Sequence, residues 1–308
     1  MKLVTLKALV AAVEEGSLRG AARRINVSQP ALTKMIRELE VELSTALLVR
    51  TSKGVLPTAQ GKVLYERSLK VSRELGAAVD EIRQLSGYMV GELTIGAVPV
   101  AVLLLVPETL RTFGRDFPKI RINVTEELYM AQLQRLRKSE IDVALCGIPA
   151  GLAAGEFSIE PLMTTRMVVV TRKDHPLSKA RSLVELARAN WVYTGSSFDS
   201  GYAKTLFESH GMTAPPVGAV VNSTLTLLSL IANGDLVGLM PEQIAHHPVA
   251  RQFTTIVPVV EGGLDLAIGA ITRSESVVSP AIRHLIAHLH RAAHQVNLRH
   301  NAITGGAA

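Results

Sequence analysis

The N-terminal part of the chain carries three short helical periodicities separated by two tight breaks, and this constrains the fold more than any other feature. The first periodicity runs from Leu3 to Glu15 and ends at Gly16. Ser17 and Ser28 are each placed to accept a hydrogen bond from the first turn of the helix that follows. The pattern therefore predicts a helix-turn-helix.

The third of these helices has one apolar face and one polar face. Its apolar residues recur at helical spacing toward the core, while the polar face carries amide, hydroxyl and basic groups, which match base edges and phosphates in a DNA groove. The alternative is a small helical bundle whose Ser and Gln only cap helices. We interpret the following as candidate DNA contacts: Ser17, Ser28, Gln29, Pro30, Thr33, Lys34 and Arg37.

A short hairpin is the simplest interpretation of the segment after this helix. The segments Leu47–Arg50 and Val55–Leu56 flank the turn-forming Thr51–Gly54. A hairpin beside a helix-turn-helix forms a wing, and Arg50 and Lys53 on it are predicted to hold neighbouring phosphates.

The basic excess of the chain is confined to the same region. Between Met1 and Lys70 there are 12 Lys and Arg against 6 Asp and Glu, which equals the whole net charge of +6. A neutral remainder joined to a basic N-terminal segment is typical of a DNA-binding module attached to a ligand-binding module.

The N-terminal region contains an ordered set of residues: Gly16-Ser17-Leu18, Ala21-Ala22, Val27-Ser28-Gln29-Pro30-Ala31-Leu32, Ile36, Leu39-Glu40, Leu43, Arg50 and Pro57-Thr58-Ala59-Gln60-Gly61. This set resembles the signature of LysR-type transcriptional regulators. Three departures are visible, namely Thr33 for the usual serine, Ser44 for glycine and Leu48 for phenylalanine, and none removes a group needed for DNA contact.

A long linker helix is predicted over residues 59–89, after Thr58 as its cap. Its apolar residues alternate by four and three, which favours a coiled-coil partner, although packing against the chain's own C-terminal domain is the alternative. The resemblance implies that this helix pairs with its counterpart in a second chain. The two recognition helices of such a dimer would be related by two-fold symmetry and would read a palindromic DNA site. The seam comprises Leu64, Ser68, Val71, Leu75, Ala78, Ile82 and Leu85.

From Gly91 the pattern changes to short strands alternating with helices, which predicts an α/β fold with mostly parallel sheets. The resemblance implies two lobes joined by two crossing strands, as in periplasmic binding proteins. The expected domains are a winged helix-turn-helix over 1–58, the linker helix, an effector-binding domain over 91–293 and a C-terminal tail over 294–308. Within the effector-binding domain, lobe I comprises 91–161 and 268–293, and lobe II comprises 165–265.

The predicted strands are Leu93–Val98, Ile120–Val124, Val143–Cys146, Met167–Thr171, Val217–Val221, Leu236–Met240 and Leu266–Ile271. The predicted helices between them are Leu103–Phe113, Ala131–Arg137, Tyr202–His210 and Leu225–Ala232.

Loops at the carboxyl ends of the predicted strands form the candidate effector site, because open α/β sheets bind ligands there. Their hydroxyls and amides suit an anionic group and their apolar side suits a ring, so we hypothesise a small, aromatic organic acid. The polar residue usual in the family after the first strand is missing, since Pro99-Val100 stands in its place. The candidate residues are Pro99, Val100, Leu128, Tyr129, Gly147, Thr194, Ser196, Ser197, Asn222, Ser223 and Thr224.

Other chemistries find little support in the sequence. Gln60-Gly61-Lys62-Val63 lacks the spacing and hydroxyl of a phosphate-binding loop. His284 and His288 lack a third ligand, so we interpret them as a solvated helix face, and the lone Cys146 as a small core residue. We expect no metal and no cofactor.

The expected partners follow from this interpretation and from the resemblance: double-stranded promoter DNA, a small-molecule effector, a second copy in dimers that pair into tetramers, and RNA polymerase. We found no secretory signal and no apolar run long enough for a membrane helix, so the expected compartment is the cytoplasm. The competing classes are a solute-binding protein, which would need a signal peptide, and an α/β enzyme, which would need an acid, base or nucleophile constellation. No such constellation was found.

Overall fold

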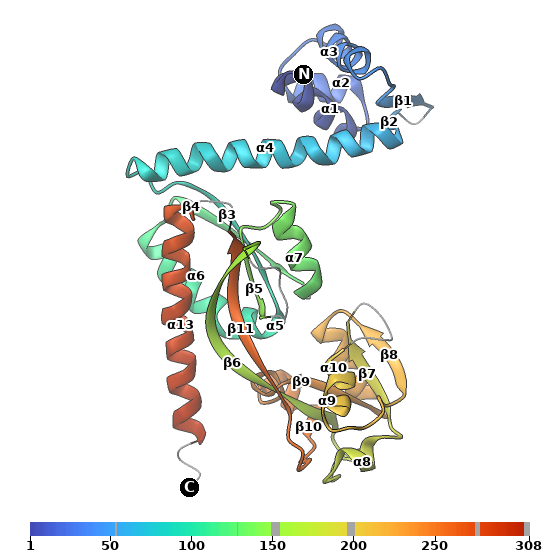
Figure 1. The fold of residues 1–308 in the computed structure, drawn as a ribbon, viewed down its shortest axis with the longest axis vertical. Coiled ribbons are helices and arrows are strands. Elements are labelled where there is room, and N and C mark those ends of the chain that lie inside the picture. Colours follow the sequence, from blue (N-terminus) through green and yellow to red (C-terminus); the bar gives the residue numbers. More distant parts are fainter. Residues whose placement is uncertain (53, 128, 149–154, 196–200, 275–277, 305–308) are drawn as a thin grey trace. The chain divides into compact units, whose positions relative to one another are not determined.

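The structure is a computed structural model, and it describes residues 1–52, 54–127, 129–148, 155–195, 201–274 and 278–304 (Figure 1). The chain forms two compact units, Met1–Ile82 and Arg83–Ala308. The long helix α4, Ala59–Leu85, begins in the first unit and ends in the second. Among the described residues, no helix combines the length and the apolar character needed to span a bilayer.

The first unit is a winged helix-turn-helix. Helices α1, α2 and α3 enclose a small core of Leu, Ala and Ile side chains, including Leu9 and Leu32, both fully buried. Strands β1 and β2 pair antiparallel, with Leu48 opposite Pro57 and Thr51 opposite Gly54. The elements are α1 Leu3–Glu15, α2 Leu18–Arg24, α3 Gln29–Glu42, β1 Leu48–Thr51 and β2 Gly54–Pro57.

Serine caps begin the two helices of the motif, as the sequence predicts. The Ser17 hydroxyl accepts a hydrogen bond from the amide of Gly20 at 3.0 Å, and that of Ser28 accepts one from the amide of Ala31 at 3.2 Å. Each cap satisfies one of the amide groups that the first turn leaves without a helical acceptor. These contacts fix where α2 and α3 begin.

The turn after α3 contains one departure from the family signature, Ser44 in place of glycine. Ser44 has a φ of 51°, in the left-handed region that glycine adopts at no steric cost. A serine here holds a strained backbone conformation, and the surrounding turn keeps it there through a hydrogen bond from the Thr45 amide to the Glu40 carbonyl at 3.0 Å.

The second unit is an α/β domain built on one hydrogen-bonded sheet with the strand order β4-β3-β5-β11-β6-β9-β7-β8, and β10 pairs with β6. Its strands are β3 Gly91–Ala97, β4 Ile120–Glu126, β5 Val143–Gly147, β6 Phe157–Arg172, β7 Asn190–Thr194, β8 Val217–Val221, β9 Leu236–Pro241, β10 Thr254–Ile256 and β11 Leu264–Arg273. Its helices are α5 Pro99–Leu104, α6 Val106–Asp116, α7 Tyr129–Arg137, α8 Leu183–Leu186, α9 Tyr202–Ser209, α10 Thr224–Asn233, α11 Glu242–Ala245, α12 Pro248–Arg251 and α13 Pro280–Thr304.

Two lobes share this sheet. We call the part built on β3, β4 and β5 lobe I and the part built on β7, β8 and β9 lobe II. The long strands β6 and β11 run through both lobes and pair with each other antiparallel (Figure 1). Within the described part of the chain, parallel pairing occurs only among the other strands, inside each lobe. The sheet is therefore mixed, and the expectation of a mostly parallel sheet is wrong.

Several predicted elements have different bounds in the structure. The strand predicted over Met167–Thr171 is the end of β6, and the helix predicted over Leu103–Phe113 is divided between α5 and α6. Pro107 has no amide hydrogen and stands in the first turn of α6, where that loss is harmless, so a new helix begins there. The expected tail from residue 294 is partly helical, because α13 continues to Thr304.

Candidate DNA-binding surface and ligand cavity

Helix α3 presents the predicted polar residues on its outer face. Gln29, Pro30, Lys34 and Arg37 are exposed, and Leu32, Ile36 and Leu39 are buried on the other side. The Thr33 hydroxyl donates to the carbonyl of Gln29 at 2.9 Å, so in this state it bonds its own helix. Ser17 and Ser28 serve as caps in the structure. The structure thus brings Gln29, Pro30, Lys34 and Arg37 together on one exposed face.

The hairpin stands beside this helix in the same unit. Arg50 is exposed on β1 directly opposite Val55 of β2. The amide of Val55 donates to the carbonyl of Gly16 at 2.8 Å, which attaches the hairpin to the end of α1. Lys53 lies outside the described residues.

Helix α4 divides the predicted seam into two parts. Leu64 packs against the core of the helix-turn-helix, and Ser68 is buried, with its hydroxyl bonded to the carbonyl of Leu64 at 2.7 Å. From Val71 onward the apolar seam residues are exposed, with 46% of Leu75 and 65% of Ile82 accessible. Exposed leucine and isoleucine at heptad spacing leave an apolar strip that a second helix can cover.

A cavity of about 90 Å³ lies in the second unit, between lobes I and II. Its wall is mainly aliphatic, and its polar groups are the side chains of Thr165, Thr194, Tyr202 and Thr224. No Lys, Arg, His, Asp or Glu is among the described residues that line it. The lining comprises Val98, Pro99, Val100, Gly147, Thr165, Met167, Thr194, Tyr202, Thr224, Leu227, Leu239, Met240, Pro241, Ile244, Leu266 and Ile268.

Five predicted effector residues line this cavity: Pro99, Val100, Gly147, Thr194 and Thr224. Asn222 and Ser223 precede α10 and are not part of the lining, which includes Thr224, the first residue of that helix. Leu128, Ser196 and Ser197 lie outside the described residues, as does the side chain of Tyr129, whose backbone begins α7.

Sequence reasoning missed cavity residues from a crossing strand and from a helix of lobe II. Thr165 of β6 is 2% exposed, and its hydroxyl donates to the Gln243 side-chain oxygen at 2.5 Å. Tyr202 begins α9 in lobe II, yet its hydroxyl lies 3.6 Å from where a Cβ would stand on Gly147 of lobe I. The Tyr202 side chain thus reaches from lobe II to the Gly147 position of lobe I.

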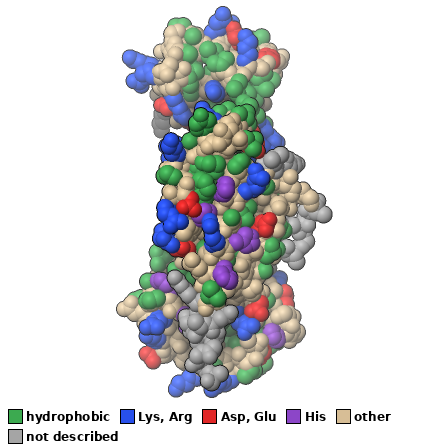
Figure 2. Space-filling view, turned by 90° about the vertical axis from the view of Figure 1, so that its left-hand side faces the viewer, with side chains coloured by type: hydrophobic (Ala, Val, Ile, Leu, Met, Phe, Trp, Pro, Cys, Tyr) green, Lys and Arg blue, Asp and Glu red, His purple; other side chains and the backbone are tan. Residues whose placement is uncertain are grey.

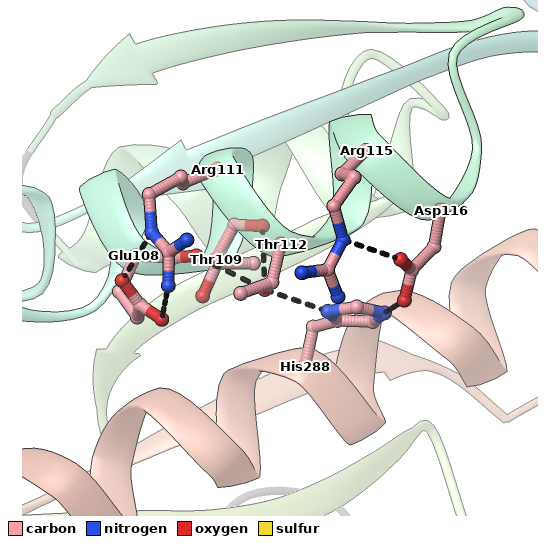
Figure 3. A network of polar contacts seen from close by, with 7 residues as sticks. All are labelled: Glu108, Thr109, Arg111, Thr112, Arg115, Asp116 and His288. Carbon is pink, nitrogen blue, oxygen red and sulfur yellow. Dashed lines mark hydrogen bonds and ion pairs between the residues drawn. The ribbon is translucent and has the colours of Figure 1, made fainter.

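Lobe I contains a polar network between α6 and α13 (Figure 3). Nδ1 of His288 lies 2.7 Å from the Thr112 hydroxyl, and Nε2 lies 3.6 Å from a carboxylate oxygen of Asp116. The interpretation of His288 as part of a solvated face is wrong, because the ring is only 2% exposed and packs edge-on to Phe113. Burial lowers the pKa of His288, which favours the neutral ring.

Basic and histidine side chains gather on the outer face that carries α13 (Figure 2). His284, His290 and Arg291 are exposed there, and His290 lies 3.6 Å from a Glu160 carboxylate oxygen. Among the residues that the structure describes, no three His, Cys, Asp or Glu side chains are grouped so as to hold a metal ion.

Cys146 lies on β5 and is fully buried, as predicted. Burial raises the pKa of its thiol to about 12, so the nucleophilic thiolate is not populated near neutral pH.

A winged helix-turn-helix, a long helix and a two-lobed α/β domain with an internal cavity are the parts of a ligand-binding transcription regulator. Residues 3–62 match the family described as bacterial regulatory helix-turn-helix protein, lysR family, and residues 86–294 match the LysR substrate binding domain. The chain belongs to the LysR-type family of transcriptional regulators. This family consists of regulators and not of enzymes.

Individual relatives are distant in sequence but similar along most of the chain. The HTH-type transcriptional regulator TdcA of Escherichia coli K12 is 26% identical over 81% of this chain and 80% of its own length. GbpR of Azospirillum brasilense is 28% identical over 97% of this chain and 88% of its own length. Full-length CbnR, solved in complex with its target DNA, matches with a TM-score of 0.71 at 22% identity, covering 95% of this chain and 100% of that one. At this identity CbnR shows the fold alone.

Proposed function

We propose that the protein binds operator DNA as a dimer through α3 and the wing, and that a small organic acid in the cavity between the lobes changes DNA occupancy or promoter activation. The observation that carries the proposal is the cavity, since its lining comes from both lobes and a bound molecule would contact both at once. Such a ligand stabilises one arrangement of the lobes only by as much as it discriminates between arrangements.

The proposed division of labour on DNA follows from the chemistry of the exposed groups. Gln29 and Arg37 on the outer face of α3 suit base edges in the major groove, and Arg50 on the wing suits a phosphate. Arg50→Ala should weaken binding to all sequences and lower the salt slope by about one unit, whereas Gln29→Ala should relax base preference.

Gel-shift titrations with genomic DNA from upstream of the gene, at several salt concentrations and against scrambled DNA, would measure both effects. Arg121→Ala in the effector domain, which removes an exposed arginine paired with Glu92, is the control. Equal losses on specific and scrambled DNA for both Gln29→Ala and Arg50→Ala would contradict the division.

Dimerisation through α4 is supported by the exposed strip from Val71 to Leu85. A heptad strip of this kind buries its apolar side chains when two copies pair, and pairing would present two recognition helices to a palindromic site.

The proposed effector has an apolar or aromatic body and an anionic group. The aliphatic wall, including Val100, supports the apolar body. Thr224 supports the anionic group, because it is the first residue of α10, where a hydroxyl and free helical amides occur together. Thr194 is the second candidate donor, and Ser196, Ser197 and Ser223 remain sequence predictions.

Calorimetry with a panel of aromatic carboxylates, aromatic sulfonates and neutral analogues of the same shape would test the effector class. Thr224→Val should weaken an anionic ligand by roughly 1–3 kcal/mol by removing one donor, while DNA affinity without ligand is unchanged. Thr226→Val, on the exposed side of the same helical turn, is the matched control. If only the neutral analogues bind tightly, the proposal of an anionic effector is wrong, while the proposal that the cavity binds the effector stands.

A further inference from the structure

An acidic residue on the DNA-binding helix contacts the base of the wing. Glu40 lies near the end of α3, and one of its carboxylate oxygens accepts hydrogen bonds from the amides of Leu47 at 2.8 Å and Leu48 at 3.2 Å. Leu48 is the first residue of β1. A single side-chain oxygen therefore joins the recognition helix to the start of the hairpin.

The other strand of the hairpin has an attachment of its own. The Val55 amide donates to the Gly16 carbonyl, and a Cβ on the neighbouring Gly54 would stand 2.3 Å from that same carbonyl oxygen. Gly54 also has a φ of 129°, which a side chain would strain. Because Val55 pairs directly with Arg50, this attachment lies opposite the wing arginine.

A negative charge on a DNA-binding helix needs a compensating role, because it opposes the attraction to phosphates. The neighbouring Glu38 shows the ordinary situation, since it is exposed and lies 3.8 Å from Lys34 in an ion pair of little energetic value. Glu40 instead is half-buried and holds two backbone amides. Hydrogen bonds to an ionised carboxylate are stronger than neutral ones.

We infer that Glu40 is a positioning residue for DNA binding: with the Gly16–Val55 contact, it fixes the wing against α3 so that Arg50 and the base-reading residues engage one DNA segment together. A two-stranded hairpin is only marginally stable alone, so its orientation depends on such attachments. Without the Glu40 contact, the wing becomes ordered only when DNA binds. The entropy lost in ordering it then reduces the DNA affinity that Arg50 and the base-reading residues supply together. The inference rests on the proposed phosphate contact of Arg50.

The test compares Glu40→Ala, Glu40→Gln, Arg50→Ala and the Glu40→Ala/Arg50→Ala double variant in salt-dependent binding to upstream genomic DNA. Glu40→Ala should weaken binding about tenfold and lower the salt slope by about one unit, as Arg50→Ala does, although it removes a negative charge. The double variant should be little worse than either single variant. Glu40→Gln keeps the accepting oxygen and should bind within about twofold of wild type.

Glu38→Ala is the matched control, because it removes the same charge from the same helix without touching the wing, and it should leave binding equal or slightly tighter. Thermal melts followed by circular dichroism check folding. If Glu40→Ala does not fold, Glu40→Asp keeps the charge but draws the oxygen back by one methylene, and it should give the same loss and the same coupling to Arg50.

Additive effects of Glu40→Ala and Arg50→Ala, unchanged binding by a folded Glu40→Ala or Glu40→Asp, or an equal loss in Glu40→Gln would overturn the inference while leaving the phosphate contact intact. If Arg50→Ala leaves DNA binding unchanged, the proposed phosphate contact is wrong, and so is the positioning role of Glu40 that depends on it.

Discussion

In the N-terminal unit the side chains proposed to contact DNA stand exposed on one helix and one hairpin, whereas the cavity proposed to hold the effector is lined by buried and half-buried side chains from both lobes. Gln29 and Arg37 are brought together by the period of a single helix. Thr165 lies on β6 and Thr224 begins α10, and the two residues line one cavity only because the tertiary fold brings these segments together. A surface built locally can be recognised in a short stretch of sequence, whereas a cavity built from distant segments requires the tertiary fold.

The two regions also differ in how they use charge. Residues 1–70 of the first unit carry a formal charge equal to the net +6 of the whole chain, while the described lining of the cavity consists of aliphatic side chains and hydroxyls. Long-range attraction thus belongs to the DNA-binding unit and shape selection to the effector domain. The variants below test whether the two regions behave as independent bodies.

Trp191→Ala should cause the largest loss of stability, and this loss should be limited to the effector domain. The ring is fully buried, packs edge-on to Phe207 at 5.3 Å, and donates from its indole nitrogen to the Leu186 carbonyl at 3.1 Å. Removing such a side chain costs about 3–5 kcal/mol. Scanning calorimetry should show the effector-domain transition moving to lower temperature while that of the DNA-binding unit stays.

Val184→Ala, at a position 69% exposed, is the control for that experiment. A single transition that moves as a whole in Trp191→Ala would show that the two units unfold together.

Leu75→Asp should separate dimers and thereby weaken DNA binding without changing the effector cavity. A charge placed in an apolar helix seam costs of the order of 3 kcal/mol or more. Sedimentation should show monomers under the conditions in which the wild-type chain forms the proposed dimer. Ala77→Asp adds the same charge on the opposite side of α4, and its mass should stay that of wild type; loss of assembly in both would point to helix unfolding instead.

Acid should destabilise the effector domain before the DNA-binding unit. Burial lowers the pKa of His288 below its ordinary value of 6.5, so the unfolded chain takes up a proton that the folded domain resists. The unfolding free energy should be level above about pH 7 and decline as the pH falls through 6.5 and below. All nine histidines follow position 174, so the first unit should show no change from pH 8 to 6.

Urea unfolding across this pH range, in wild type and His288→Gln, measures the contribution as the difference between the two curves. His290→Gln, an exposed position on the same helix, should retain the wild-type pH dependence. If wild type and His288→Gln show the same dependence of unfolding free energy on pH, groups other than His288 cause the acid sensitivity.

Ser44→Gly should give the smallest effect, a stabilisation of the DNA-binding unit by about 0.5–1 kcal/mol. Glycine relieves the left-handed conformation at the end of α3, and its greater freedom in the unfolded chain offsets part of the gain. Melting of the first unit should rise by a few degrees, and the effector-domain transition should not move. The same change at exposed Ser52 should not stabilise, and a destabilised Ser44→Gly would mean that the serine side chain is needed.

What could be predicted from the sequence follows the same division. Ser17 and Ser28 cap helices through contacts three residues away, so local pattern was sufficient to locate them. Thr165 and Tyr202 gave no local signal, since their place at the cavity depends on strand register and on the approach of one lobe to the other. The strand β7 was missed although Trp191 and Tyr193 are typical of a buried strand.

The pairing of β6 with β11 has a mechanical consequence for the effector domain. From Phe157 opposite Arg273 to Met167 opposite Leu264, the two strands form one ribbon, interrupted by an irregularity between Ile268 and Gly269. We expect the lobes to move relative to each other mainly by torsion of this ribbon, because stretching or shearing it would lengthen its hydrogen bonds. Thr165, Leu266 and Ile268 place the cavity on that axis. A small rotation of the lobes that a ligand imposes at the cavity would therefore produce a larger displacement at the far ends of both lobes.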